Sequence, residues 1–124
     1  MARAKTILIV DDDTDLRGLL CEQLELHEEF AANGAPTASD GLRMAKESRP
    51  DLILLDLHMP VLDGFGAVGQ LRAEPRFAAT PVVALTASAM DGDREHAMTA
   101  GFSGYITKPI RLAALRAEVR RLIG

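Results

Sequence analysis

Three short runs of consecutive apolar residues divide the chain, at positions 7–10, 52–55 and 82–85. None of them alternates apolar with polar residues, as a strand with one solvated face does. Uninterrupted runs of this length are typical of strands that are buried on both faces of a parallel sheet. Two more polar segments, residues 29–33 and 104–107, are weaker strand candidates, and their composition favours positions nearer the edges of the sheet.

Segments with helical periodicity separate these runs. Leu16, Leu20 and Leu24, for example, recur every four residues, with charged side chains on the opposite face. Pro50 is expected to end the second helix, and Gly101 is a suitable residue to follow the fourth. The predicted helices cover residues 14–27, 39–48, 63–73, 91–100 and 110–123.

Alternation of strands and helices predicts an α/β fold with a doubly wound sheet of five parallel strands and right-handed crossovers. A length of 124 residues suits one domain, so residues 1–124 are expected to fold as a single unit. In such sheets the ligand binds outside the carboxyl ends of the strands. This rule directs the search for chemistry to the residues that follow each apolar run.

The composition excludes several functional classes. A net charge of −4 without a clustered basic surface gives no support for a direct nucleic-acid partner. No apolar segment is long enough to span a membrane or to act as a signal peptide. Cys21 is the single cysteine, so an intrachain disulfide is impossible. These features lead us to expect a cytoplasmic protein.

Polar residues that could do chemistry stand where the predicted strands end: Asp11 and Asp12, Asp56, Thr86 and Lys108. Parallel strands would bring all of them to one rim of the sheet. Clustered carboxylates repel one another unless a cation compensates, and oxygen ligands of this kind suit Mg²⁺. Asp56 could then act as a nucleophile in phosphoryl transfer, which needs mainly positioning and charge neutralisation. Mg²⁺ and Lys108 would supply the charge, and the Thr86 hydroxyl could donate a hydrogen bond to a phosphoryl oxygen.

The acidic residues after the first strand also have simpler interpretations. Acids at a helix N-terminus are common because they cap the helix and oppose its dipole. Asp11, Asp13, Asp15 and Glu22 also match the ligand spacing of a calcium loop. That loop requires Gly where this chain has Leu16, and the segment from Leu16 onward reads as an amphipathic helix. We therefore reject the calcium loop.

Taken singly, the other candidates have ordinary structural interpretations as well. Asp56 could cap a turn, Thr86 could be a strand former, Lys108 a solvated loop residue, and Tyr105 an edge-strand packing residue. Asp56 is the least ordinary of them, because a buried apolar strand that ends in a charge beside other acids is costly without a role. The joint arrangement favours a functional site over these separate explanations.

The ordered set of motifs resembles the receiver domain of bacterial two-component response regulators, over the whole chain. Each motif alone is weakly specific, whereas the set in this order is highly specific. The matching elements are the Asp11-Asp12 pair, Asp56 within Leu-Leu-Asp-Leu-His-Met-Pro followed by Asp63-Gly64, Thr86 within Ala-Leu-Thr-Ala, and Lys108-Pro109 after Tyr105. The resemblance implies the flavodoxin-like, CheY-like (βα)5 fold with strand order 2-1-3-4-5. Residues 89–93 and 105–110 look like those of single-domain regulators and of receivers attached to hybrid kinases.

The resemblance also implies a role for each site residue. Asp56 accepts a phosphoryl group from a histidine kinase or a histidine phosphotransfer protein. Asp12, Asp56 and the backbone carbonyl of His58 bind Mg²⁺ directly, while Asp11 acts mainly through water. Lys108 pairs with the phosphoryl group, and its peptide bond to the following proline is expected to be cis.

A switch follows from the same resemblance. Thr86 moves toward the phosphoryl group, and Tyr105 changes rotamer in step. The surface of the fourth helix, fifth strand and fifth helix then changes its affinity for a downstream protein target. His58 and Ser88 stand at positions that tune the attack of water on the aspartyl phosphate in this family. The chain is expected to be a monomer or weak dimer. It is not expected to be an enzyme, apart from catalysing its own phosphorylation and dephosphorylation.

Two rival functions share parts of this site. Phosphatases of the haloacid-dehalogenase type also use an Asp nucleophile, Mg²⁺, a Thr or Ser and a Lys. Their nucleophile follows the first strand, whereas Asp56 follows the third predicted one, and their general acid is an Asp where this chain has His58. A scaffold that has lost phosphorylation is disfavoured by the intact set of Asp12, Asp56, Thr86 and Lys108.

Overall fold

The structure is a computed structural model that describes residues 4–26, 30–87 and 93–124. Five parallel strands form one sheet in the order β2-β1-β3-β4-β5, which confirms the predicted order. The strands are β1 (Lys5–Val10), β2 (Phe30–Ala35), β3 (Leu52–Asp56), β4 (Val82–Thr86) and β5 (Gly104–Thr107).

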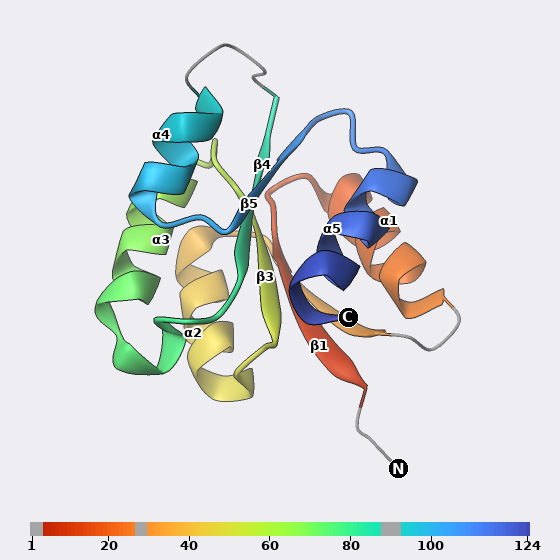
Figure 1. The fold of residues 1–124 in the computed structure, drawn as a ribbon, viewed down its shortest axis with the longest axis horizontal. Helices are drawn as coiled ribbons and strands as arrows, with labels where there is room; N and C mark the ends of the chain where they lie inside the picture. Colours follow the sequence, from red (N-terminus) through yellow and green to blue (C-terminus); the bar gives the residue numbers. More distant parts are fainter. Residues whose placement is uncertain (1–3, 27–29, 88–92) are drawn as a thin grey trace.

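Helices cover both faces of the sheet (Figure 1). Helices α1 and α5 lie on one face, and α2, α3 and α4 lie on the other. The helices are α1 (Thr14–Glu25), α2 (Ala38–Ser48), α3 (Gly64–Ala73), the short 3-10 helix η2 (Pro75–Phe77), α4 (Asp93–Ala100) and α5 (Leu112–Ile123). The doubly wound α/β architecture is therefore confirmed. Among the described residues, no helix has the length and apolar character needed to cross a bilayer.

The apolar strands divide their side chains between two cores. In β3, Ile53 and Leu55 pack toward α2, α3 and α4, while Leu52 and Leu54 pack toward α1 and α5. All four side chains are at most 2% exposed. Because both faces are buried, the positions of β3 before its last residue are all apolar, and this explains the absence of period-two alternation in the sequence.

Strands β2 and β5 form the two edges, as their more polar sequences predicted. Strand β2 continues to Ala35, two residues beyond the predicted end. Asn33-Gly34 would favour a turn in isolation, but pairing of these residues with Leu8 and Ile9 keeps them in the ladder. The side chain of Arg17 lies so close to Gly34 that a Cβ there would be 2.7 Å from it.

Capping residues set most of the remaining helix boundaries. Asp63 is the N-cap of α3, and its side chain accepts a hydrogen bond from the Gly66 N–H at 2.8 Å, so the helix begins at Gly64 rather than at 63. Helix α5 begins at Leu112, two residues later than predicted. Gly101, with φ +118°, ends α4 as expected. Helix α1 ends at Glu25, with Leu26 as its C-cap, before the predicted end at residue 27. The predicted start of the fourth helix, at residue 91, lies outside the described residues.

Arg72 joins α3 to the segments around η2 and β5. Its guanidinium donates hydrogen bonds to the carbonyl oxygens of Gly101 at 2.9 Å, Phe77 at 2.7 Å and Thr80 at 2.7 Å, and to Ser103 Oγ at 3.3 Å. Burial lowers the pKa of this guanidinium from its usual value. One side chain thus satisfies several carbonyl groups that lie outside regular secondary structure.

Candidate functional site

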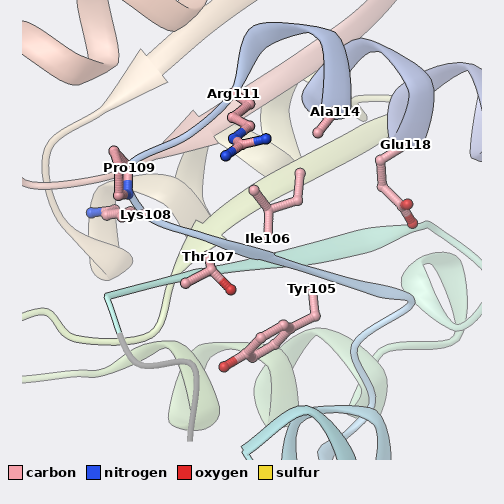
Figure 2. Close-up of a pocket in the computed structure, with 8 residues that line it drawn as sticks. All are labelled: Tyr105, Ile106, Thr107, Lys108, Pro109, Arg111, Ala114 and Glu118. Carbon is pink, nitrogen blue, oxygen red and sulfur yellow. The ribbon is translucent and has the colours of Figure 1, made fainter.

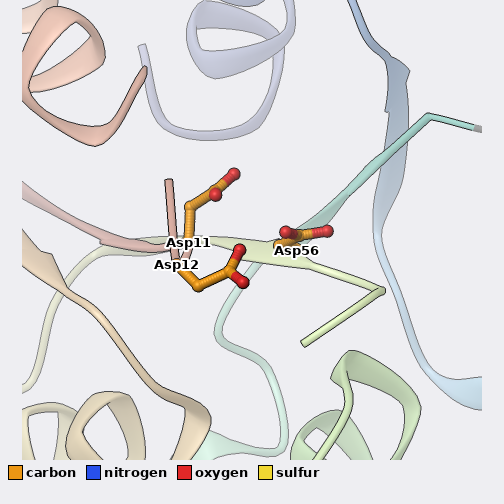
Figure 3. A group of neighbouring side chains, drawn as sticks. All are labelled: Asp11, Asp12 and Asp56. Carbon is orange, nitrogen blue, oxygen red and sulfur yellow. The ribbon is translucent and has the colours of Figure 1, made fainter. Parts of the chain in front are cut away.

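Three carboxylates gather where β1 and β3 end (Figure 3). Asp56 is the last residue of β3, and Asp11 and Asp12 directly follow β1. Each residue has a carboxylate oxygen within 4.8 Å of those of the other two. Asp11 is fully buried, Asp56 is 4% exposed, and Asp12 is exposed. The acidic residues predicted to meet at one rim are therefore neighbours.

Backbone groups fix the first part of the site. The Asp13 N–H donates to Asp11 Oδ1 at 2.9 Å, and the Asp13 side chain caps α1 by accepting from the Leu16 N–H at 3.1 Å. The capping interpretation of the acidic run therefore applies to Asp13. Arg17, which sequence reasoning missed, donates from Nη1 to the Asp11 carbonyl oxygen at 2.7 Å. Its only signal in the sequence is its place in the second turn of α1.

Lys108 is the cation that reaches the carboxylates. Its Nζ lies 2.9 Å from Asp11 Oδ2 and 3.4 Å from Asp56 Oδ2. Burial alone lowers the pKa of the Lys108 ammonium, but hydrogen bonds and charge from the two acids outweigh burial, so its pKa is raised. The Lys108–Pro109 peptide bond is cis, as predicted. Strand β5 thus brings a charged lysine to the ends of β1 and β3.

The carboxyl group of Asp56 is held in a site with too little positive charge. Its pKa is raised, chiefly by burial and further by the negative charge of Asp11. A hydrogen bond from the His58 N–H to Oδ1 at 3.0 Å and the charge of Lys108 act in the opposite direction. Within the described part of the chain, the ammonium of Lys108 faces both Asp11 and Asp56, which leaves room for further positive charge.

The donor set fits a divalent cation. Asp11 Oδ2 is buried, and among the described residues its charged partner is the Lys108 ammonium at 2.9 Å. Carboxylate oxygens that lie together at a solvent-accessible rim are suitable ligands for Mg²⁺, which binds through a few carboxylates and keeps several waters. The exposed Asp12 supplies the side of the cluster that faces solvent.

Close backbone packing holds the segment after Asp56 in place. A Cβ on Gly64 would lie 2.5 Å from the Asp56 carbonyl oxygen. This distance is too short for any residue other than glycine without a shift of the backbone. The Gly64 N–H donates to the Leu57 carbonyl oxygen at 3.0 Å. The Asp63-Gly64 pair therefore has two separate tasks, a helix cap at Asp63 and a close approach at Gly64.

Thr86 and Tyr105 connect the site to the edge of the sheet. Thr86 is the last residue of β4 and is fully buried. Tyr105 lies on the neighbouring β5, and its hydroxyl shares a hydrogen bond with Thr86. The pKa of Tyr105 is raised, mainly by burial and by the charge of Asp93, against the effect of that hydrogen bond. These two residues, predicted to act together, are in direct contact.

A shallow pocket of about 430 Å³ lies between β5 and α5. Figure 2 shows Tyr105 on the other side of β5 from Arg111 and Glu118. Lys108 also lines the pocket, so one residue belongs both to this surface and to the acidic site.

His58 and Ser88 are the two positions expected to tune dephosphorylation, and the structure describes only the first of them. His58 is exposed, and its backbone N–H is used by Asp56. Ser88 lies outside the described residues, as do residues 89–92.

Curated relatives support one family. The model of the response regulator receiver domain matches residues 7–120. An uncharacterized 14.6 kDa protein from Leptolyngbya boryana is 41% identical over 104 residues, which are 84% of this chain and 79% of that protein. The transcriptional regulatory protein PrrA of Mycobacterium leprae is 41% identical over 117 residues, 94% of this chain but 49% of PrrA. The chain thus spans about half the length of this regulator.

Solved structures with a similar fold come from the same family. The chemotaxis protein CheY4 of Vibrio cholerae superposes with a TM-score of 0.91 at 25% identity, covering 98% of this chain and 100% of CheY4. The receiver domain of the sensor histidine kinase PA1611 from Pseudomonas aeruginosa, solved with magnesium in its active-site cleft, gives 0.87 at 33% identity, with 98% and 99% covered. From its fold, its motifs and these relatives, the chain belongs to the response regulator receiver domain family, whose members are signalling switches of two-component systems.

Proposed function

We propose that this chain is a phosphorylation-driven switch in which Asp56 accepts the phosphoryl group. The observation that carries the proposal is the buried Asp56 carboxylate, which lies close both to the Lys108 ammonium and to the acids that follow β1. An Asp56 oxygen attacks the phosphorus of a phosphohistidine. The new O–P bond forms as the P–N bond breaks, and the electron pair stays on the imidazole nitrogen, which takes up a proton.

Charge neutralisation is the main requirement of this reaction. When bound, Mg²⁺ supplies positive charge to the phosphoryl oxygens, and Asp12, Asp56 and the His58 carbonyl would hold it, with Asp11 acting through water. Lys108 supplies the second positive charge, since its ammonium already lies within 3.4 Å of Asp56 Oδ2. The His58 N–H holds the other carboxylate oxygen and so orients the group.

The signal leaves the site through Thr86 and Tyr105. A phosphoryl group on Asp56 offers new oxygen acceptors to the Thr86 hydroxyl, and Thr86 already shares its hydrogen bond with Tyr105. A change at Thr86 therefore alters the position of Tyr105, which lies at the surface made by α4, β5 and α5. A downstream protein that favours one of these states shifts the equilibrium between them.

Two further functions belong to the proposal. The side chains of His58 and Ser88 tune how fast water removes the phosphoryl group. The donor is a histidine kinase or a histidine phosphotransfer protein of the cytoplasm, and the chain binds it and its downstream target as a monomer or weak dimer. The resemblance to the receiver domain of a sensor kinase is consistent with such a phosphorelay.

A small phosphodonor provides the first test. Incubation with phosphoramidate and Mg²⁺ is expected to add one phosphoryl group per chain, measured by intact mass, because one carboxylate in the site has a nucleophilic role. A phosphate ester such as p-nitrophenyl phosphate is expected to show no sustained turnover. Multiple turnovers of the ester would instead favour a phosphatase of the haloacid-dehalogenase type.

Replacement of the lysine is expected to separate loading from signalling. Lys108→Ala should retain part of the phosphoryl uptake, because the carboxylates and Mg²⁺ remain, but the phosphorylated variant should lose the change in partner affinity. The measurement is the affinity for the downstream target before and after phosphorylation, with Lys46→Ala as a control lysine paired with Glu74 far from the site. A full affinity shift in Lys108→Ala would contradict the coupling role.

A further inference from the structure

The turn between β1 and α1 contains two of the three clustered acids, Asp11 and Asp12, and one arginine ties it to α1. The Arg17 N–H donates to the Asp13 carbonyl oxygen at 2.9 Å, as the first turn of a helix requires. The Arg17 side chain turns back and donates from Nη1 to the Asp11 carbonyl oxygen at 2.7 Å. Arg17 therefore holds the backbone on both sides of Asp12.

Three hydrogen bonds orient three consecutive peptide groups of this turn. The Asp11 N–H donates to the Ala35 carbonyl oxygen at 3.1 Å, and the Asp13 N–H donates to Asp11 Oδ1 at 2.9 Å. These two bonds orient the peptide groups before Asp11 and after Asp12. The peptide group that joins Asp11 to Asp12 is oriented through its carbonyl oxygen, which accepts from Arg17. Because each peptide group is planar, rotation of this one would change the backbone dihedrals of both acids.

Asp12 depends on this backbone for its position in the cluster of acids (Figure 3). Its side chain is exposed, and no hydrogen bond or ion pair between described residues holds its carboxylate. Asp11 and Asp56, in contrast, each have a carboxylate oxygen within 3.4 Å of the Lys108 ammonium. The direction in which Asp12 points toward the other two acids is therefore set by the peptide group that Arg17 holds.

A glycine on the edge strand leaves room for the arginine. A Cβ on Gly34 would lie 2.7 Å from both Cγ and Cδ of Arg17, so the stem of this side chain lies directly against the backbone of β2. Gly34 pairs with Ile9 in the regular ladder between β2 and β1. This position therefore requires a residue without a side chain rather than an unusual backbone conformation. Contact with β2 keeps the Arg17 stem on a path that leads to the Asp11 carbonyl oxygen.

We infer that Arg17 is a positioning residue for the acidic cluster, which orients Asp12 and thereby raises the affinity of the site for Mg²⁺. This inference rests on the proposed function. Hydrogen bonds that orient the ligands of a metal commonly change metal affinity by about 10- to 100-fold. The charge of the guanidinium would act in the opposite direction, because a cation near the carboxylates repels a second cation. Loss of Arg17 would therefore tighten Mg²⁺ binding if charge were its only effect.

The test is the dissociation constant of the full chain for Mg²⁺, measured by isothermal titration calorimetry with magnesium chloride alone. Arg17→Met keeps a good helix former but removes the hydrogen bond, so its dissociation constant is expected to rise about tenfold. Gly34→Ala keeps the guanidinium but displaces its stem, and a rise of about threefold or more is expected. Gly18→Ala is the matched control, because a Cβ there meets nothing within 4 Å, and it should bind Mg²⁺ like the parent chain.

Uptake from phosphoramidate separates positioning from a general loss of structure. In Arg17→Met, the Mg²⁺ concentration that gives half of the maximal rate should rise by the same factor as the dissociation constant. The rate at saturating Mg²⁺ should stay within about twofold of the parent rate, because Asp56 and Lys108 are unchanged. The double variant of Arg17→Met and Gly34→Ala should bind Mg²⁺ no more weakly than Arg17→Met, since the glycine acts through the arginine.

Parent-like or tighter Mg²⁺ binding in Arg17→Met would overturn this inference while leaving the proposed function intact. Parent-like binding in Gly34→Ala, or losses that multiply in the double variant, would also overturn it, because the two residues would then not act as one device. A lower rate at saturating Mg²⁺ with an unchanged dissociation constant would place Arg17 in another step and overturn it as well. Failure of the parent chain to bind Mg²⁺ would overturn the metal site of the proposed function, and this inference with it.

Discussion

Asp56→Asn is expected to abolish phosphoryl uptake from phosphoramidate, with a loss on the order of 10³-fold or more in rate. The amide has nearly the shape of the carboxylate but is a very poor nucleophile. Neither remaining acid is placed to replace it, because Asp11 is buried against Lys108 and Asp12 is held on the solvent side of the cluster. Intact mass after incubation with Mg²⁺ and phosphoramidate measures the loss.

Asp63→Asn is the matched control, since it makes the same chemical change in the loop that follows Asp56. Asn is as good an N-cap as Asp, so the hydrogen bond to the Gly66 N–H should persist and uptake should remain at the parent level. If Asp56→Asn takes up phosphoryl groups like the parent chain, Asp56 is not the acceptor.

Loss of folding does not account for the expected defect, and stability measurements can show this. The folded-state pKa of Asp56 is raised above its ordinary value, chiefly by burial. The stability that this group contributes is therefore fully present below the unfolded-state pKa and is lost as the pH rises through the folded-state pKa. Without divalent cations, Asp56→Asn should be more stable than the parent chain at neutral pH, and the difference should shrink toward acidic pH.

Arg72→Met is expected to lower the free energy of unfolding by about 3 kcal/mol. The guanidinium donates to the carbonyl oxygens of Gly101, Phe77 and Thr80, and Met can donate to none of them. Hydrogen bonds from a charged donor contribute roughly 1.5–3 kcal/mol each, and the cost of desolvating the guanidinium reduces their sum. Denaturant unfolding monitored by circular dichroism measures the change.

Arg43→Met provides the comparison. The Arg43 side chain is 59% exposed and forms ion pairs with Asp40 and Glu47 on the surface of α2, so its loss should change stability by less than about 0.5 kcal/mol. Arg72→Lys should fall between the two, because an ammonium can satisfy only some of the carbonyl groups. A loss below about 1 kcal/mol in Arg72→Met would show that these hydrogen bonds are replaced by water.

The sequence predicted the fold well where a single physical rule dominates. Stretches of strand buried on both faces are almost entirely apolar, so the runs within β1, β3 and β4 were visible without alignment. Strand β2 was harder, because the turn preference of Asn33-Gly34 conflicts with its pairing to β1, and pairing prevails. The start of α5 was also displaced, since the periodic pattern does not distinguish the first turn of a helix from the extended residues before it.

For the site, the sequence indicated which residues meet, but not how they are held. Because the carboxyl ends of parallel strands meet at one edge of the sheet, the sequence predicted that Asp11, Asp56 and Lys108 lie together. The distances among their charged groups agree. The contacts of Arg17 and Arg72 with carbonyl oxygens carry no periodic signal, because any long polar side chain at a helix surface looks alike in a sequence. The positive φ of Val61, +71°, was equally hidden, since the pattern of apolar and polar residues carries no information about the sign of φ in a loop.

The hydrogen bond between Tyr105 and Thr86 also makes the molecule its own optical reporter. The chain has one tyrosine and no tryptophan, so its tyrosine fluorescence and the tyrosine bands of its near-ultraviolet spectrum come from one phenol ring. The phenol is hydrogen-bonded to Thr86, the last residue of β4, and β4 pairs with β3, the strand that carries Asp56. If Asp56 is loaded as proposed, emission intensity and anisotropy at this ring are expected to change with loading, and they can be recorded in real time without a dye and without a second protein.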